Sequence, residues 1–484
     1  MSTGSSFAPA QRPSHTKIVA TLGPASDTLE KVAELLRAGV DVFRLNTAHG
    51  TLADHQRRLE TIREASRTTD QPVGVLADLA GPKMRLGEIA GGVFECHVGE
   101  TVRIVRGEES DIPGDLVTTY APLLDELAPG VRVLLADGTV VLEVEEVDSG
   151  AALCRVMQPG TLRSRQGLNL PGLKLSAPAL NVYDRECTAW AVRAGVDFLG
   201  LSFVRRPEDI EELRSVVDAN GGHTQIIAKI EKPEAVERLQ SIVAAADGIM
   251  VARGDLGVEV DIANLPMIQK RIVAACNVAR KPVIIATQML DSMQRSRLPT
   301  RAEATDVANA ILDGADACML SGETAIGEYP RESVEMMHRI AVATEPVLRD
   351  RQAPLSLKRL DDTERPVTEA VTRAAGRVAD ALDARLVVVV TATGQTALRV
   401  SKNRQFVPTM GVSDCDRVVR RMCLYWGVLP IRTPLTDEPR VLLDSIVRCG
   451  RDRGWLASGD RVVLVAGTGI SSSRHNALVV HEVE

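Results

Sequence analysis

The chain has 484 residues and a net charge of −7 at pH 7, and this length predicts several domains rather than a single core. The acidic balance, without any basic block, argues against a nucleic-acid-binding protein. No apolar run reaches the roughly 18 residues that a membrane span needs, so we expect no membrane association. Eight cysteines without Cys-x-x-Cys spacing are typical of reduced thiols in a cytoplasmic protein.

Residues 1–15 are rich in Ser and Pro and lack the apolar centre of a signal peptide, so we expect a disordered tail. Apolar runs of strand length then alternate with amphipathic segments of helical period. Eight runs have strand character: 17–22, 41–45, 73–78, 198–204, 225–230, 248–251, 282–287 and 317–320. Eight β/α units in series predict a closed (β/α)8 TIM barrel, formed by residues 16–86 and 176–348.

The interval between the third and fourth of these runs is too long for one crossover helix. Residues 87–175 are rich in Val and Gly and contain short alternating runs such as 101–105, 131–135 and 140–144. We predict an inserted all-β domain, a small β-barrel over the mouth of the larger one. Gly81-Pro82 and Pro171-Gly172 lie near its ends and are candidate hinges of this lid.

After residue 349 a charged linker to residue 365 precedes a second alternating region. Helices are expected at 367–382, from 395 onwards and at 417–425, and strands at 386–390, 409–412, 461–466 and 478–483. Residues 349–484 therefore predict an open α/β domain.

Polar residues gather where the apolar strands of the predicted barrel end. Lys229-Ile230-Glu231 ends one run, and Arg253-Gly254-Asp255 follows the next. A single Asp or Ser after a strand is as often a helix cap as a functional group, but caps do not explain the cations. Because (β/α)8 barrels build their active sites at these strand ends, the pattern indicates a site for phosphate and a divalent metal.

The sequence resembles the pyruvate kinase family along nearly its whole length. The matching segments are 16–26, Arg44-Leu45-Asn46 with His49-Gly50, Asp78 with Gly81-Pro82 and Arg85, 168–172, 202–205, 229–231, 250–257, 286–290, 299–303 and 319–324. The resemblance implies phosphoryl transfer from phosphoenolpyruvate to ADP, giving pyruvate and ATP.

The resemblance also implies roles for the residues at the strand ends. Glu231 and Asp255 would hold Mg²⁺ (or Mn²⁺), and Lys229 and Arg44 would neutralise the phosphoryl group in transfer. Thr287 would serve the proton relay.

The remaining contacts to the substrates are implied in the same way. The backbone amides of Gly254 and Asp255 would seat the substrate carboxylate. Asn46, His49 and Arg85 would contact the nucleotide phosphates.

The sequence departs from the family pattern at the monovalent-cation site. Asn46 and Asp78 match it, but Ala48, Leu79 and Lys83 replace a Ser, a Thr and a Glu. We predict that K⁺ is not required and that Lys83 stands in for the ion. The alternative is that Lys83 is a surface residue of a poor enzyme.

Two further departures lie where the resemblance places the nucleotide. Gln166 stands where the family usually has a Lys, and Ala136 replaces an acidic residue of the lid. Arg165 beside Gln166 is a candidate substitute, although Arg and Lys differ at phosphates. We expect weaker nucleotide binding.

The C-terminal domain carries Thr391, Thr393, Gly394 and Thr396 between a predicted strand and helix. Hydroxyls and a Gly at a helix start suit a phosphate, and the resemblance implies an allosteric site for a phosphorylated effector. A plain capped turn is the alternative. The nearby segment 467–476 is expected to close over the effector.

Other functions compete with the kinase. A Mg²⁺-dependent aldolase or lyase also pairs a Glu with an Asp at strand ends, but it needs neither a phosphate-binding cation nor a nucleotide lid. A catalytically weak regulatory paralogue is the other alternative. The family resemblance implies a homotetramer, with Arg301 in the segment that meets a neighbouring subunit.

Overall fold

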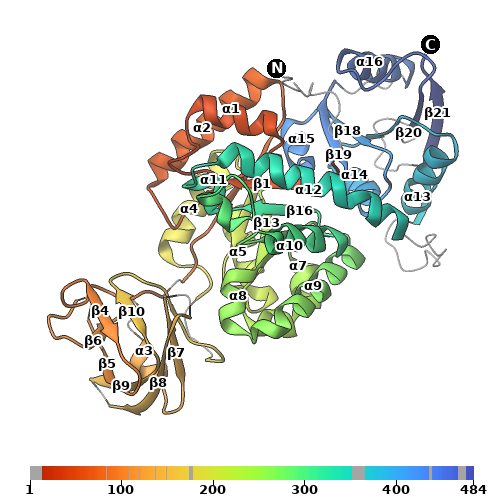
Figure 1. The fold of residues 1–484 in the computed structure, drawn as a ribbon. Helices are drawn as coiled ribbons and strands as arrows, with labels where there is room; N and C mark the ends of the chain where they lie inside the picture. The colour runs from red at the N-terminus through yellow and green to blue at the C-terminus, as the bar shows by residue number, and fades with distance from the viewer. Residues whose placement is uncertain are drawn as a thin grey trace.

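The computed structural model describes residues 14–82, 84–107, 109–118, 120, 122–136, 138–148, 150–173, 178–351, 366–434, 439–466 and 476–484. The chain forms a central barrel with a β-rich lid at one end and an α/β domain at the other (Figure 1). Lys83, the 352–365 segment and the 467–475 segment lie outside the described residues.

Eight parallel strands close the barrel in the order β1-β16-β15-β14-β13-β12-β3-β2. They are β1 (Lys17–Thr21), β2 (Val42–Asn46), β3 (Gly74–Asp78), β12 (Phe198–Leu201), β13 (Gln225–Ile230), β14 (Gly248–Ala252), β15 (Val283–Ala286) and β16 (Ala317–Leu320). The predicted fold class is confirmed. The fourth strand stops at Leu201 rather than at Val204, because the chain turns at Phe203 with a φ of 55°.

Helices cover the outside of the barrel. They are α1 (Leu29–Ala38), α2 (Leu52–Thr69), α4 (Val182–Arg193), α5 (Pro207–Ala219), α6 (Pro233–Glu237), α7 (Leu239–Ala245), α8 (Arg253–Glu259), α9 (Leu265–Ala279), α10 (Arg301–Leu312), α11 (Gly322–Ala325) and α12 (Pro330–Arg351), with 3₁₀ turns at Ile262–Asn264 and Asp291–Gln294. Capping boxes at Thr51, Asn181 and Thr300 fix three of the helix starts. None of the described helices is long and apolar enough to cross a membrane.

The lid contains two sheets, ordered β10-β4 and β11-β7-β8-β9-β5-β6. Its elements are β4 (Val93–Cys96), β5 (Thr101–Val105), β6 (Asp115–Val117), α3 (Leu123–Glu126), β7 (Arg132–Leu135), β8 (Val140–Val147), β9 (Ala151–Gln158), β10 (Gly160–Arg163) and β11 (Leu168–Asn169). The one-turn helix α3 departs from the all-β expectation. The turn between β7 and β8 reaches α8, since a Cβ at Gly138 would lie 3.8 Å from Val258 Cγ1.

The C-terminal domain is a five-stranded sheet of order β19-β18-β17-β20-β21, in which only β21 is antiparallel to its neighbour. Its elements are α13 (Pro366–Ala381), β17 (Leu386–Val390), α14 (Gln395–Lys402), β18 (Thr409–Ser413), α15 (Asp416–Met422), β19 (Val428–Arg432), α16 (Pro439–Asp452), β20 (Arg461–Ala466) and β21 (Ala477–Glu482). The sequence interpretation missed β19 and α16. Helix α12 continues to Arg351, past the expected start of the linker at residue 349.

The C-terminal domain closes the end of the barrel where the strands begin. Barrel residues such as Val42 and Ile227 share one buried cluster with Met422 and Leu424 of the C-terminal domain. Lys17 Nζ donates to the carbonyl oxygen of Val428 at 2.7 Å. Packing therefore fills this end of the barrel.

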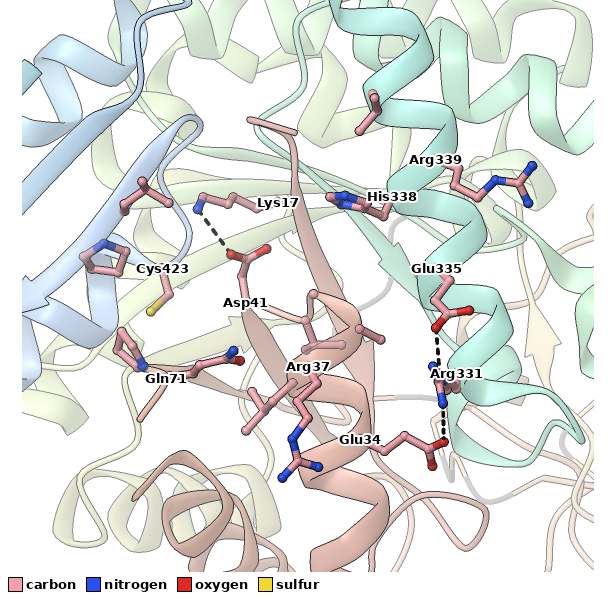
Figure 2. Close-up of a pocket in the computed structure, with 18 of the residues that line it drawn as sticks. Lys17, Glu34, Arg37, Asp41, Gln71, Arg331, Glu335, His338, Arg339 and Cys423 are labelled. Atoms are coloured by element: carbon pink, nitrogen blue, oxygen red, sulfur yellow. Dashed lines mark hydrogen bonds and ion pairs between the residues drawn. The ribbon is translucent and has the colours of Figure 1, made fainter. Parts of the chain in front are cut away.

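A cleft of about 1590 Å³ remains beside this junction, between α1 and α12 of the barrel and β19 of the C-terminal domain. Two ion pairs lie in its lining, Lys17 with Asp41 at 3.2 Å and Arg331 with Glu335 at 2.7 Å (Figure 2). None of the predicted catalytic residues lines this cleft.

Candidate active site

Lys229 and Glu231 lie at the carboxyl end of β13, where their side chains meet other charged groups. Lys229 Nζ is 2.9 Å from Glu231 Oε1 and 3.3 Å from Asp78 Oδ1. It also donates to Ser202 Oγ at 2.7 Å, and that hydroxyl donates to the carbonyl oxygen of Leu79 at 2.7 Å. Residues from β3, β12 and β13 therefore converge on one ammonium group.

Arg44, in the middle of β2, completes this cluster. Its Nε donates to Asp78 Oδ2 at 2.7 Å, and its Nη1 donates to Thr21 Oγ1 at 3.2 Å. Asp78 thus joins Arg44 to Lys229 and fixes the spacing of the two cations.

Burial and charge set the protonation of the cluster. Burial would by itself lower the pKa of Lys229, but Asp78 and Glu231 outweigh it and the pKa is raised. Burial would raise the pKa of Asp78, but Lys229 and Arg44 lower it overall. Both partners are therefore charged at neutral pH.

Glu231 differs from Asp78 in that burial and the nearby Asp255 carboxylate raise its pKa. Glu231 Oε2 accepts the Phe203 N–H at 2.7 Å, and the buried Oε1 lies 2.9 Å from Lys229 Nζ. A buried carboxylate oxygen of this kind, with a second carboxylate nearby, is a fitting ligand for a hard divalent cation.

The donor set fits Mg²⁺ only if substrate oxygens complete the coordination. Among the described residues, no group of three or more His, Cys, Asp or Glu is placed to hold a metal. Glu231 and Asp255 would therefore supply only part of the oxygen ligands, as in sites where Mg²⁺ is shared with phosphate.

Thr287 and Gly254 form a second contact across the mouth of the barrel. Thr287 has a φ of 70°, an outlier for a β-branched residue, and its Oγ1 donates to the carbonyl oxygen of Ala286 at 2.7 Å. The Gly254 N–H donates to Thr287 Oγ1 at 2.7 Å. This amide was expected to seat a substrate carboxylate, and in the structure it is already engaged by Thr287.

Arg253 holds the start of α8 in place. Its Nη1 donates to Asp306 Oδ1 at 2.7 Å, and its Nη2 donates to the carbonyl oxygen of Thr287 at 2.9 Å. Arg253 therefore has structural partners. Asp255 follows it two residues later on the same helix, α8.

The family model described as "Pyruvate kinase, barrel domain" matches residues 13–334, and the one described as "Pyruvate kinase, alpha/beta domain" matches residues 369–481. The chain belongs to the pyruvate kinase family. The suspected resemblance is confirmed, and the chain is an enzyme of the kinase class.

Two relatives illustrate the extent of the similarity. A pyruvate kinase of Mycobacterium intracellulare is 43% identical over 451 residues, which cover 93% of this chain and 94% of the relative. A pyruvate kinase of Geobacillus stearothermophilus is 41% identical over 472 residues, covering 97% of this chain and 80% of the relative.

The residues expected at the nucleotide of a pyruvate kinase come from the end of barrel strand β2 and from the start of the lid. Asn46 ends β2, where it pairs in register with Asp78 and its Oδ1 accepts the Ala48 N–H at 3.2 Å. His49 is exposed just beyond it. Arg85 lies where the chain passes into the lid, and its Nη1 donates to the carbonyl oxygen of Arg165 at 3.1 Å.

The family departures in the lid have local partners of their own. Gln166 Oε1 accepts the Arg163 N–H at 2.7 Å, and Arg165 pairs with Glu88 at 2.7 Å. Ala136 has a φ of 51°. Arg165, the candidate substitute for the missing Lys, is therefore already in an exposed ion pair.

At the expected monovalent-cation site, Leu79 is buried and brings no side-chain oxygen. The Asp78 carboxylate is shared between Arg44 and Lys229. Lys83, which we predicted to replace the ion, lies outside the described residues.

The predicted effector site lies at the start of α14, in the C-terminal domain. Gly394 has a φ of 83°, and its N–H donates to Thr391 Oγ1 at 3.0 Å. Thr393 Oγ1 accepts the Gln395 N–H at 3.5 Å, and Thr396 is buried. The turn thus makes local hydrogen bonds of its own, and the effector site stays a prediction.

Sequence reasoning did not assign Ser202, Phe203 or Thr21 to the site. Ser202 and Phe203 stand at the end of a predicted strand beside Arg205, and this is the signal that was available for them. Thr21 is the last residue of an apolar strand, and its sequence context carries no such signal.

Proposed function

We propose that the chain transfers the phosphoryl group of phosphoenolpyruvate to ADP, giving pyruvate and ATP. The observation that carries this proposal is the buried cluster of Arg44, Asp78, Lys229 and Glu231 at the mouth of the barrel. Two cations held on one carboxylate, beside a second carboxylate suited to a metal, match the needs of phosphoryl transfer.

Each charged residue has a part in this proposal. Arg44 and Lys229 bind the phosphoryl oxygens and offset their negative charge while the bond from phosphorus to the enol oxygen breaks. A new bond forms from phosphorus to a terminal oxygen of ADP. The enolate carbon then takes a proton, whose delivery Thr287 would orient.

Glu231 and Asp255 are the residues that would hold Mg²⁺ or Mn²⁺, which when bound offsets the charge of substrate oxygens. Asn46, His49 and Arg85 would contact the nucleotide. The backbone of Gly254 would seat the substrate carboxylate only by exchanging its bond to Thr287. The lid, whose β7–β8 turn already lies against α8, excludes water when nucleotide is bound.

Three finer features belong to the same proposal. K⁺ is not required, because Ala48 and Leu79 remove two oxygen ligands and Lys83 supplies a fixed charge. A phosphorylated effector binds at Thr391, Thr393, Gly394 and Thr396. The protein is a cytoplasmic homotetramer, and the eight unpaired cysteines favour the reducing compartment.

The test is formation of pyruvate from phosphoenolpyruvate and ADP with Mg²⁺, in the wild type and in Glu231→Gln. The matched control is Glu345→Gln, an equally buried carboxylate at the opposite end of the barrel. We expect turnover in the wild type and the control, and a loss of at least about 100-fold in Glu231→Gln. No turnover in the wild type, with or without phosphorylated effectors, would favour the regulatory paralogue.

A lyase is disfavoured by the same cluster. Cleavage of a carbon–carbon bond next to a carboxylate needs a metal but no second cation for a phosphoryl group. Arg44 and Lys229 are both held on Asp78 at the mouth of the barrel. Formation of ATP, measured directly, separates the two activities.

A further inference from the structure

Phe203 has a backbone conformation that its side chain disfavours. Its φ is 55°, in the left-handed region, where a bulky residue is an outlier. In this conformation its N–H donates to Glu231 Oε2 at 2.7 Å. Strain of this kind persists where the surroundings fix it, and it gathers at functional sites.

The ring of Phe203 lies against Gly81, at the hinge where the chain leaves β3 for the lid. A Cβ placed on Gly81 would lie 2.8 Å from Phe203 Cδ2 and 2.9 Å from Ser202 Cβ. Gly81 itself has a φ of 67°. Only glycine fits this position, because both the space and the backbone conformation exclude a side chain.

The same turn touches the other functional groups of the barrel mouth. Ser202 accepts a hydrogen bond from Lys229 Nζ, as described above. Lys232 Nζ lies 5.9 Å from the centroid of the Phe203 ring and pairs with Glu259 Oε1 at 2.6 Å. Glu259 is on α8, which also carries Asp255 and meets the lid at Val258.

We propose that Phe203 is a positioning residue that couples the lid hinge at Gly81 to the metal-binding carboxylate Glu231. The ring is held between the hinge and Lys232, and it keeps the backbone N–H aimed at Glu231 Oε2. Movement of the hinge is transmitted through the ring to this carboxylate, so metal affinity depends on the position of the lid. This inference rests on the proposed metal site at Glu231 and Asp255.

The test measures Mn²⁺ affinity by electron paramagnetic resonance, with phosphoenolpyruvate present, without reliance on turnover. Wild type, Glu231→Gln, Phe203→Ala, Gly81→Ala and the double variant are compared. Phe198→Leu is the matched control, because Phe198 is a buried Phe at the start of β12, the strand that precedes Phe203. Phe203→Tyr keeps a ring and serves as the rescue variant, and circular dichroism checks folding.

We expect Phe203→Ala and Gly81→Ala each to weaken Mn²⁺ binding by about 10-fold or more, as loss of an outer-shell partner does. The double variant is expected to bind Mn²⁺ no more weakly than the single variant with the lower affinity, because both changes break the same coupling. Phe203→Tyr and Phe198→Leu should bind as the wild type does. Should Phe203→Ala not fold, Phe203→Leu replaces it.

Two results would overturn the coupling while leaving the proposed function intact. One is wild-type affinity in both single variants when Glu231→Gln abolishes binding, and the other is strictly additive losses in the double variant. Absence of Mn²⁺ binding in the wild type, or binding unaffected by Glu231→Gln, would remove the proposed metal site and the inference with it.

Discussion

Lys229 Nζ and Glu231 Oε1 lie 2.9 Å apart at the end of β13, and both side chains are buried. The two residues are two positions apart, which places their side chains on the same face of an extended chain. Asp78 shares the ammonium from a neighbouring part of the barrel. Removal of the Lys229 ammonium group leaves the buried carboxylates of Asp78 and Glu231 close together without a positive charge between them.

Replacement of Lys229 by Met is expected to lower kcat for pyruvate formation by about 1000-fold. The reason is that the buried ammonium group, which offsets the negative charge of the phosphoryl group in transfer, is lost. The control is Lys270→Met, since Lys270 is half-exposed and pairs with Asp313 on the outside of the barrel. Steady-state kinetics at saturating Mg²⁺ measure the effect. Equal kcat values in the two variants would show that Lys229 is structural.

The sequence predicted the barrel strands well because each is a short buried run between helix signals. It missed β19, Val428–Arg432, whose burial is mixed and which contains Pro430. It placed Asp78 in the remnant of a monovalent-cation site, which stays a prediction, and it did not foresee the ion pairs of that carboxylate with Arg44 and Lys229. Strand ends can be predicted from a sequence, but the ion-pair partners of each side chain depend on the register between neighbouring strands.

The same limit explains why the sequence did not predict the strained backbone conformations of Phe203 and Thr287. Both have positive φ values, of 55° and 70°, although neither residue type favours that region. Local propensity indicates extended chain at both positions. The left-handed conformation is imposed by contacts with Gly81, Gly254 and Glu231, which are distant in sequence.

Turnover is expected to be the same in K⁺ and in tetramethylammonium buffers. The physical reason is that Ala48 and Leu79 offer no side-chain oxygen to a monovalent ion. A triple variant, Ala48→Ser, Leu79→Thr and Lys83→Glu, should become dependent on K⁺. A coupled assay over a K⁺ titration measures this, and a wild type that is active only with K⁺ would contradict it.

His55 is expected to make folding stability dependent on acid pH. It is fully buried on α2, neither ring nitrogen has a hydrogen-bond partner among the described residues, and its ring centroid lies 5.9 Å from that of Trp190. Burial, with a smaller contribution from Arg58, lowers the pKa of His55 below its ordinary value of 6.5. The unfolded chain therefore binds this proton more readily than the folded chain does.

Stability from neutral His55 is present above pH 6.5 and is lost as the pH falls below that value through the folded pKa. His55→Met should flatten this dependence, because it removes the titrating group and keeps an apolar side chain. Thermal melts from about pH 5 to pH 8 measure it, with the exposed His97→Gln as control. Equal slopes in wild type and His55→Met would contradict the prediction.

Asp316 is expected to hold the C-terminal domain on the barrel. It precedes β16, and its carboxylate lies 2.5 Å from Lys402 Nζ and 3.0 Å from Arg404 Nη1, both from the region of α14. Asp316 and Lys402 are each 1% exposed. Asp316→Asn leaves two cations without their carboxylate and should cost about 3–5 kcal/mol of stability at pH 7.

The exposed pair of Asp416 and Arg432 is the control, and Asp416→Asn should cost at most about 1 kcal/mol. Denaturant unfolding measures both variants. Burial lowers the pKa of Lys402 to about 8, against the opposing effect of Asp316. A buried ammonium that has lost its carboxylate releases its proton still more easily.

The defect of Asp316→Asn is therefore expected to shrink as the pH rises towards about 8, because Lys402 becomes neutral in the variant at a lower pH than in the wild type and then no longer needs a partner. Between the folded pKa of Lys402 and the ordinary value of 10.5, the unfolded chain holds this proton and the folded chain does not, so folding stability rises with pH. The variant enters this range at a lower pH than the wild type does. Arg404 stays charged throughout, so part of the defect persists. A defect that is constant from about pH 6 to pH 8 would assign the whole loss to Arg404.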